Sequence, residues 1–237
     1  MVMATALVTG GNKGLGFEVA RQLVGAGDSV YVGARDVGRG EAAARRLGAR
    51  FVQVDVTDEE SVAAAVKVVE AGGGLDVLVN NAGIEERTAD GGFVPAAEVT
   101  ADSVRTAFET NVFGIVRVTH AFLPLLQRSA APVIVNVSSG LGVTRALADP
   151  DSPARFYPGI AYPASKAAVN MITVQYAKAF PGIRINAADP GFTATDLNHN
   201  TGTQTVEEGA ASIVRLARIG QDGPTGGFFD ANGPMDW

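Results

Sequence analysis

Cysteine is absent from the 237-residue chain, which excludes disulfides, thiolate metal sites and a cysteine nucleophile. The two histidines, His120 and His199, are far apart and lack metal-ligand spacing, so the sequence predicts no metal site. Long apolar runs are absent too, because no stretch approaches the roughly 20 residues that span a bilayer. The amino terminus enters an apolar segment without a basic stretch or cleavage site. We therefore expect a cytoplasmic protein that makes no membrane contact.

Positive charge is also scarce. The net charge is −6, the pI is about 5.0, and no long basic run occurs. Binding to nucleic acid through phosphate neutralisation is therefore not expected. The hydrophobic content of 46% is that of an ordinary globular protein. Because there is no internal repeat and no linker, we predict a single domain over residues 1–237 with a substantial core.

Short apolar runs and helical patterns alternate along the chain. Strands are predicted at residues 5–9, 29–34, 51–54, 75–79, 132–137 and 184–188, with a last short strand at 227–229. Helices are predicted from about 17 to 24, and at 57–70, 100–128, 166–180 and 205–218. This alternation predicts an α/β fold in which a doubly wound parallel sheet carries helices on both faces.

Helix boundaries have their own signals. Residues 57–60 and 205–208 each match a capping box, and Thr100 is expected to cap the long helix that follows it. Pro124 should end or kink the last turns of that helix. Asn111 lies midway along it, where asparagine is locally unfavourable. The pattern favours an exposed side chain for Asn111, and the alternative is a functional role.

A glycine-rich loop, Thr9-Gly10-Gly11-Asn12-Lys13-Gly14-Leu15-Gly16, joins the first strand to the first helix. Glycines let backbone N–H groups approach a pyrophosphate, and a helix N-terminus adds partial positive charge. The arrangement predicts a dinucleotide site, although glycine for turn geometry alone is the other interpretation. Arg35 follows the second strand, where the adenosine ribose lies in such folds. Because Arg35 and Lys13 suit a 2′-phosphate, they favour NADP(H) over NAD. The other nearby arginines are expected to form a solvated helix face: Arg39, Arg45, Arg46 and Arg50.

Tyr162 and Lys166 lie one helical turn apart and therefore share a face. A neighbouring ammonium favours phenolate, so Lys166 is expected to lower the pKa of Tyr162 toward working pH. Such a pair can protonate a carbonyl oxygen or deprotonate an alcohol. The alternative is an ordinary amphipathic helix.

Three further segments follow predicted strands: residues 80–83, the pair Ser138 and Ser139, and residues 189–195. Ligands of open parallel sheets bind at the carboxyl ends of the strands, so these segments are placed to meet a cofactor or substrate. Each is also explained by a simple turn.

In their joint order and spacing, these motifs resemble the short-chain dehydrogenase/reductase family over nearly the whole chain. The matching motifs are the glycine loop, Asp55-Val56, Asn80-Asn81-Ala82-Gly83, Asn111, Ser138-Ser139, Tyr162 with Lys166, and Pro190-Gly191. The glycine loop and the insertion before Tyr162 resemble the monomeric carbonyl reductase branch, which includes plant reductases of alkaloid and terpenoid ketones. The resemblance implies a Rossmann-type fold and an NADPH cofactor.

The resemblance assigns roles to individual residues. Tyr162 is the general acid for ketone reduction, and Lys166 lowers its pKa and binds the nicotinamide ribose. Ser139, rather than Ser138, binds the substrate oxygen, and Asn111 holds a water that links Lys166 to solvent. The cofactor-binding residues that it implies are Gly10, Asn12, Lys13, Gly14, Leu15, Gly16, Arg35, Asp55, Val56, Asn81, Ala82, Gly83, Tyr162, Lys166, Pro190, Gly191 and Thr193, with Thr193 at the nicotinamide carboxamide.

The expected function is NADPH-dependent reduction of a ketone or aldehyde. Alternatives are a 3-oxoacyl-thioester reductase and a non-catalytic NADP(H)-sensing regulator. The loops at 85–95, 141–160 and 192–204 mix apolar residues with glycine, so a fairly apolar small-molecule carbonyl or alcohol is expected as substrate. Residues 141–160 are predicted as a loop insertion that either forms a pocket wall or blocks a tetramer interface. A monomer or homodimer is therefore expected rather than a tetramer.

Overall fold

A computed structural model describes residues 3–88 and 91–237. The strands are β1 (Thr5–Thr9), β2 (Ser29–Ala34), β3 (Arg50–Gln53), β4 (Val77–Asn80), β5 (Val133–Val137), β6 (Arg184–Ala188), β7 (Phe228–Phe229) and β8 (Pro234–Met235). The α-helices are α1 (Gly14–Gly25), α2 (Val37–Leu47), α3 (Glu59–Ala71), α4 (Ala101–Phe108), α5 (Gly114–Leu126), α6 (Thr144–Ala148), α7 (Ala161–Ala179) and α8 (Val206–Ala217).

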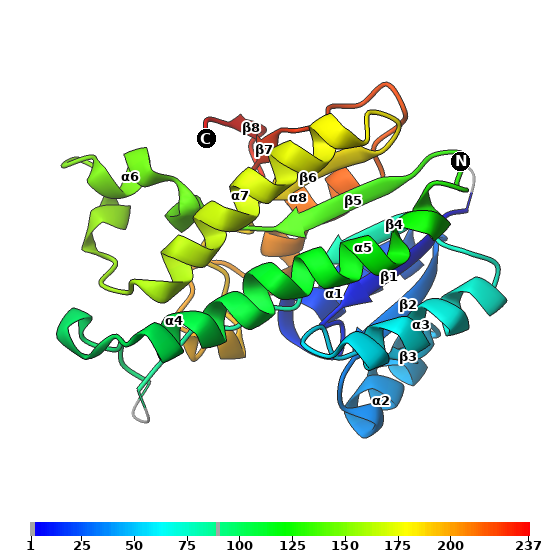
Figure 1. The fold of residues 1–237 in the computed structure, drawn as a ribbon, viewed down its shortest axis with the longest axis horizontal. Helices are drawn as coiled ribbons and strands as arrows, with labels where there is room; N and C mark the ends of the chain where they lie inside the picture. The colour runs from blue at the N-terminus through cyan, green and yellow to red at the C-terminus, as the bar shows by residue number, and fades with distance from the viewer. Residues whose placement is uncertain (1–2, 89–90) are drawn as a thin grey trace.

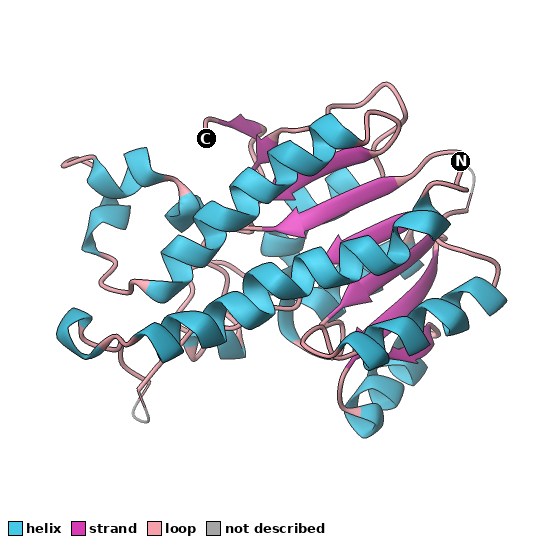
Figure 2. Ribbon diagram, viewed as in Figure 1, coloured by secondary structure: helices cyan, strands magenta, loops and turns pink. Residues whose placement is uncertain are grey.

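All eight strands form one sheet in the order β3-β2-β1-β4-β5-β6-β7-β8. Every neighbouring pair is parallel except β7 and β8, which are antiparallel. Helices cover both faces of the sheet (Figures 1 and 2). This confirms the predicted doubly wound α/β fold. The strand order reverses between β1 and β4, which is where such sheets open a crevice for ligands.

Alternating side chains of the strands supply two cores. Ala6 and Val8 of β1 point to the face that α1, α2 and α8 cover. Leu7, between them, points to the face that α3, α5 and α7 cover. Because successive side chains of a strand face opposite ways, a strand buried on both faces must be apolar throughout. The unbroken apolar runs in the sequence follow from this burial.

The predicted helix starts are confirmed at two places and wrong at one. Thr205 and Glu208 form the expected capping box, and Thr100 caps α4. The expected box at residues 57–60 does not form. Asp58 is the N-cap of α3, and its carboxylate accepts from the backbone N–H groups of Glu60 and Ser61. Thr57 instead donates its hydroxyl to the Asp55 carboxylate, so Asp58 caps the helix and Thr57 does not.

The long helix predicted at 100–128 contains a π-helical turn, Glu109–Phe113, between α4 and α5. Pro124 ends α5 within two residues, as expected. The prediction that Asn111 is exposed is wrong, because its side chain is only 1% exposed. π-Turns inside α-helices occur frequently at functional sites, and here the turn carries Asn111.

The segment predicted as a loop at 141–160 contains two short 3₁₀ turns and the helix α6. Figure 1 shows α4 and α6 projecting together beyond the carboxyl ends of the strands. Strand β8 was not predicted, because a strand of two residues is too short to show an alternation of apolar and polar side chains. The predicted loop at 85–95 includes residues 89 and 90, which lie outside the described residues. Among residues 3–88 and 91–237, no helix combines the length and apolar composition that crossing a bilayer requires.

Candidate active site

The glycine-rich loop packs tightly against the turn that follows β4. Gly10 and Gly14 have left-handed φ values of 64° and 52°. A Cβ on Gly10 would lie 3.1 Å from the Ala82 Cα, and one on Gly16 would lie 2.4 Å from the Asn81 Nδ2. At both positions, therefore, only glycine fits.

The first turn of α1 opens directly from this loop. Lys13 is the N-cap, but its side chain makes no capping hydrogen bond. The first N–H groups of a helix need partners from outside it, and together with the helix dipole they suit an anion. The loop therefore has the features of a phosphate cradle.

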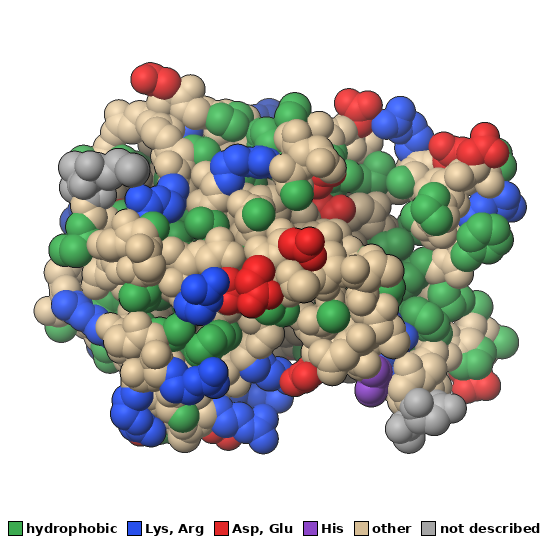
Figure 3. All heavy atoms as spheres, turned by 180° about the vertical axis from the view of Figure 1, so that it is seen from behind, with side chains coloured by type: hydrophobic (Ala, Val, Ile, Leu, Met, Phe, Trp, Pro, Cys, Tyr) green, Lys and Arg blue, Asp and Glu red, His purple; other side chains and the backbone are tan. Residues whose placement is uncertain are grey.

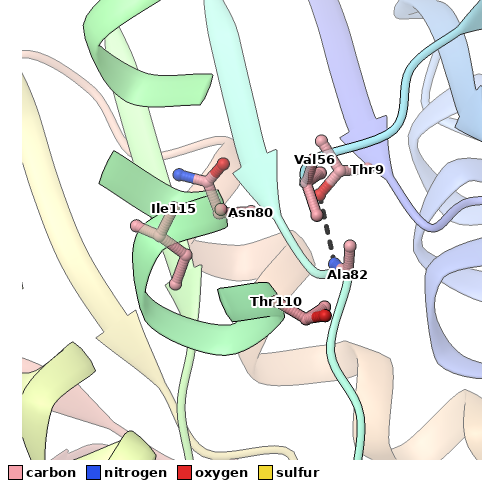
Figure 4. Close-up of a pocket in the computed structure, with 7 residues that line it drawn as sticks. Thr9, Val56, Asn80, Ala82, Thr110 and Ile115 are labelled. Carbon is pink, nitrogen blue, oxygen red and sulfur yellow. Dashed lines mark hydrogen bonds between the residues drawn. The ribbon is translucent and has the colours of Figure 1, made fainter. Parts of the chain in front are cut away.

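Hydrogen bonds fix the β1 and β4 ends to each other. The Thr9 hydroxyl accepts from the N–H groups of Asn81 and Ala82 at 3.0 and 3.1 Å, and the Asn81 Nδ2 donates to the Thr9 carbonyl at 2.9 Å. Figure 4 shows Thr9 and Ala82 joined in this way beside Val56 and Thr110, in a small pocket. Asn80 is different, because its side chain donates to Thr119 and Asn136 inside the protein. Of the segment 80–83, Asn80 therefore does not face the crevice.

Charged residues lie at the ends of β2 and β3. Arg35 is exposed, and Lys and Arg side chains gather over α2 on the surface shown at the lower left of Figure 3. Burial raises the pKa of Asp55, but hydrogen bonds from Thr57 and the positive charges of Arg35 and Arg117 outweigh it and leave that pKa below its usual value. Lys13, at the glycine loop, forms an exposed 2.9 Å ion pair with Asp196.

Tyr162 and Ser139 meet at the carboxyl end of β5. Tyr162 lies in the first turn of α7, where Pro163 is tolerated, and Ser139 follows β5. The Ser139 hydroxyl lies near enough to the Tyr162 hydroxyl to lower the pKa of Tyr162. Ser138 points elsewhere: it is 1% exposed and donates to the Asn170 side chain and the Lys166 carbonyl. The serine predicted from the resemblance is therefore the one beside the tyrosine.

Lys166 lies one turn further along α7, buried, with its Nζ 5.4 Å from the Tyr162 ring centroid and donating to the Val137 carbonyl at 2.8 Å. Burial lowers the pKa of Lys166 to about 8, against the opposing effect of the Asp189 charge. The expectation that Lys166 lowers the pKa of Tyr162 is wrong in this structure. Burial raises that pKa, the charges of Glu85 and Asp189 raise it further, and the nearby Ser139 hydroxyl opposes them.

Asn111 is bonded on three sides. Its Oδ1 accepts from the Ile84 N–H at 2.8 Å, and its Nδ2 donates to the Ile84 carbonyl at 2.9 Å and to the Ser165 hydroxyl at 3.0 Å. Ser165 donates in turn to the Tyr162 carbonyl at 2.7 Å. The side chain of the π-turn thus ties the end of β4 to the first turn of α7.

The segment after β6 is folded on itself. Gly191 has φ 70°. The Thr193 hydroxyl donates to the Pro190 carbonyl at 2.9 Å, and the side chain is 5% exposed. Thr193 therefore does not open into the site as the predicted contact with a nicotinamide carboxamide would require.

Two site residues were not anticipated from the sequence. Tyr157 donates its hydroxyl to Glu85, and its ring centroid lies 6.5 Å from that of Tyr162. Glu85 comes two residues after Gly83, and Tyr157 five before Tyr162, but neither spacing signals a contact between them. Together they line the substrate side of Tyr162. Within the described part of the chain, no three His, Asp or Glu side chains are grouped to hold a metal.

Comparison with known proteins identifies a matching family and several relatives. The short chain dehydrogenase family model matches residues 4–206. A (+)-neomenthol dehydrogenase from Capsicum annuum is 33% identical, over 94% of this chain and 94% of that enzyme. A salutaridine reductase from Papaver bracteatum is 32% identical, over 97% and 95% of the two chains. The structure of an NADPH-bound carbonyl reductase from chicken fatty liver matches all of both chains at a TM-score of 0.85 and 26% identity.

Proposed function

The chain belongs to the short-chain dehydrogenase family of oxidoreductases, and from this membership we propose that it reduces a ketone or aldehyde to an alcohol with NADPH. The observation that carries the proposal is the grouping of the Ser139 and Tyr162 hydroxyls beside the buried Lys166. Two hydroxyl groups that meet at the carboxyl end of a central strand can hold one carbonyl oxygen between them.

In the proposed reaction, Ser139 donates a hydrogen bond to the carbonyl oxygen and Tyr162 gives that oxygen its proton. Bound NADPH supplies the hydride to the carbonyl carbon. Because the pKa of Tyr162 is raised, its phenol stays protonated and ready to act as an acid. Lys166 and Asn111 hold the first turn of α7 and the ends of β4 and β5 in place around it. We also propose that Asn111 holds a water that links Lys166 to solvent, and that Lys166 binds the nicotinamide ribose.

Three observations support a dinucleotide at the glycine loop. Glycine at positions 10 and 16 lets the loop pack closely on the turn after β4, α1 begins without a side-chain cap, and an exposed arginine follows β2. We propose that the diphosphate lies along the loop and the 2′-phosphate meets Arg35, so that NADPH is preferred. The proposed cofactor residues are Gly10, Asn12, Lys13, Gly14, Leu15, Gly16, Arg35, Asp55, Val56, Asn81, Ala82, Gly83, Tyr162, Lys166, Pro190 and Gly191; Thr193 would have to release its bond to Pro190 to join them.

The aromatic residues near Tyr162 support a fairly apolar carbonyl compound as the substrate. Phe93 and Tyr157 pack edge to face at 5.0 Å beside Tyr162, and Phe156 and Phe192 lie exposed on the neighbouring loops. Since Tyr157 belongs to the segment 141–160, we propose that this segment forms a wall of the pocket. We further propose a cytoplasmic monomer or homodimer.

The test is NADPH consumption against aromatic ketones, quinones, α-ketoesters and acyl thioesters. Tyr162→Phe should bind NADPH normally and lose about 10²–10⁴-fold in turnover, because positioned acid catalysis contributes that much. Tyr176→Phe, on the same helix, is the matched control and should behave as wild type. Near-normal turnover in Tyr162→Phe would refute the assignment. Turnover of acyl thioesters alone would support the thioester reductase, and NADPH binding without any turnover would support a sensor.

A further inference from the structure

A buried carboxylate lies on the substrate side of Tyr162. The Glu85 side chain is only 5% exposed, and it accepts from the Tyr157 hydroxyl and from the Arg87 guanidinium at 2.8 Å. Burying a charge is expensive unless partners hold it, and here two partners do. Neither the proposed reaction nor the cofactor cradle uses this group, so its burial needs another explanation.

Aromatic rings connect this carboxylate to the reacting tyrosine. The Tyr157 ring lies between Phe93, at 5.0 Å, and Tyr162, at 6.5 Å. The Arg87 guanidinium lies over Phe93, 3.8 Å from its centroid. Glu85, Arg87 and Phe93 therefore pack against the segment before α7, next to Tyr162. Figure 3 shows a hollow in the surface between these two parts of the molecule.

Charged and titratable groups from several elements surround the pair of Tyr157 and Tyr162. They are Glu85 and Arg87 after β4, Asp189 after β6, Lys166 on α7 and, as a hydroxyl, Ser139 after β5. After burial, Glu85 is the largest influence on the pKa of Tyr162 and Asp189 the next, and both raise it. Burial, the hydrogen bond to Glu85 and the Glu85 charge raise the pKa of Tyr157, and the Arg87 charge opposes them. The ammonium of Lys166 is bound to the Val137 carbonyl.

We propose that Glu85 is a positioning residue for the acid: held by Tyr157 and Arg87, its negative charge keeps Tyr162 protonated and favours carbonyl reduction over alcohol oxidation. The proposal rests on the proposed function, since it needs Tyr162 as the group that exchanges the proton. Reduction requires the phenol, which is lost as pH rises through its pKa. Oxidation requires the phenolate, which is gained there. A negative neighbour therefore extends reduction and delays oxidation to higher pH.

The test is the pH dependence of both directions in Glu85→Gln, which removes the charge and keeps an acceptor for Tyr157. The rising limb of alcohol oxidation should move about one pH unit lower, so that oxidation near neutral pH gains roughly tenfold over reduction. Glu86→Gln, the same change one residue along, should leave the limb in place. Arg87→Gln keeps the carboxylate without its cation, and should move the limb the opposite way. It also serves if Glu85→Gln does not fold. Unchanged limbs in both Glu85→Gln and Arg87→Gln would overturn the proposal.

A second readout does not depend on turnover. Phenolate absorbance of the NADP⁺-bound protein is measured at one alkaline pH at which every variant is still folded, and the Tyr162 share is the part lost in Tyr162→Phe. Glu85→Gln should increase that share, and Arg87→Gln should decrease it. If no carbonyl compound is reduced but the share changes as expected, the proposed function fails and the charge effect stands. If reduction is found and the share does not change, the inference about Glu85 fails alone.

Discussion

One side of the crevice is formed mainly by backbone and the other mainly by side chains. The cofactor side, meaning residues 9–16 with 81–83, is made of backbone: positive-φ glycines, uncapped N–H groups and a Cβ-free approach of two loops. The substrate side, meaning residues 85–88, 91–95, 139–162 and 192–204, is made of side chains. There a buried carboxylate, a guanidinium and three aromatic rings contact one another across distant segments.

This difference determines what a mutation can do on each side. A site formed by backbone has few side chains to remove, so truncating a side chain there should change cofactor affinity little. Adding a Cβ to one of its glycines should weaken cofactor binding. A side-chain site loses chemistry when a group is truncated, while the cofactor cradle stays intact. The two sides should therefore be separable in a kinetic experiment, one through cofactor affinity and the other through turnover.

Ser139→Ala should give the largest separation. It removes one donor to the developing oxyanion, and the loss of such a donor costs about 10²–10³ in kcat. NADPH affinity should stay as in wild type, because the glycine loop is not touched. The measurements are single-turnover rates and NADPH titration by fluorescence. Ser138→Ala is the comparison, and should affect stability more than turnover, since Ser138 holds Asn170 and the Lys166 carbonyl. Equal turnover losses in both variants would break the distinction.

Gly16→Ala is the converse experiment on the cofactor side. The new Cβ would lie 2.4 Å from the Asn81 Nδ2 and 2.5 Å from the Gly10 carbonyl oxygen. Relieving such a clash costs about 1–3 kcal/mol, so NADPH affinity should fall roughly ten- to hundredfold while kcat at saturating cofactor changes little. Gly25→Ala, in the same helix, meets nothing within 4 Å and is the matched control. A turnover defect at saturating NADPH would contradict the separation.

The same difference explains what the sequence revealed. Backbone features are local: the glycine positions, the strand ends and the one-turn spacing of Tyr162 and Lys166 appear within short windows. The sheet was predictable for the same reason, because burial on both faces leaves unbroken apolar runs. The family resemblance supplied the roles that spacing alone left open, such as the choice of Ser139 over Ser138.

Features that depend on distant partners could not be predicted. Asn111 is buried because Ile84 and Ser165 bond to it, and no helical period encodes those contacts. The contact between Tyr157 and Glu85 joins two segments far apart in sequence. The N-cap at Asp58 was missed for a local reason, since Thr57 beside it is an equally good cap and the choice is made when Thr57 bonds to Asp55.

Lys166 lies on α7 one turn after Tyr162, and its burial gives a pH-dependent prediction of stability. Its folded pKa of about 8 lies below the unfolded value near ~10.4, so between these values the unfolded chain binds more protons and wild-type stability rises with pH. Lys166→Met removes this dependence. From pH 7 to pH 9 the free energy of unfolding of wild type should therefore rise by about 1 kcal/mol relative to that of Lys166→Met. Denaturant unfolding at both pH values measures it, and a constant difference would mean that the ammonium is not desolvated.

The smallest expected effect concerns an ion pair that joins the two sides, Lys13 with Asp196. Both side chains are more than half exposed, so Asp196→Asn should change the free energy of unfolding by only about 0.5 kcal/mol. The same substitution should strengthen the binding of NADPH. A Lys13 released from its carboxylate presents a full positive charge at the phosphate cradle, so NADPH affinity should rise by roughly two- to threefold at low salt and return to the wild-type value as salt screens the site. Titration at two ionic strengths tests this. An affinity that falls instead would show that the pair closes the substrate loop over the cofactor, and that the two sides act as one.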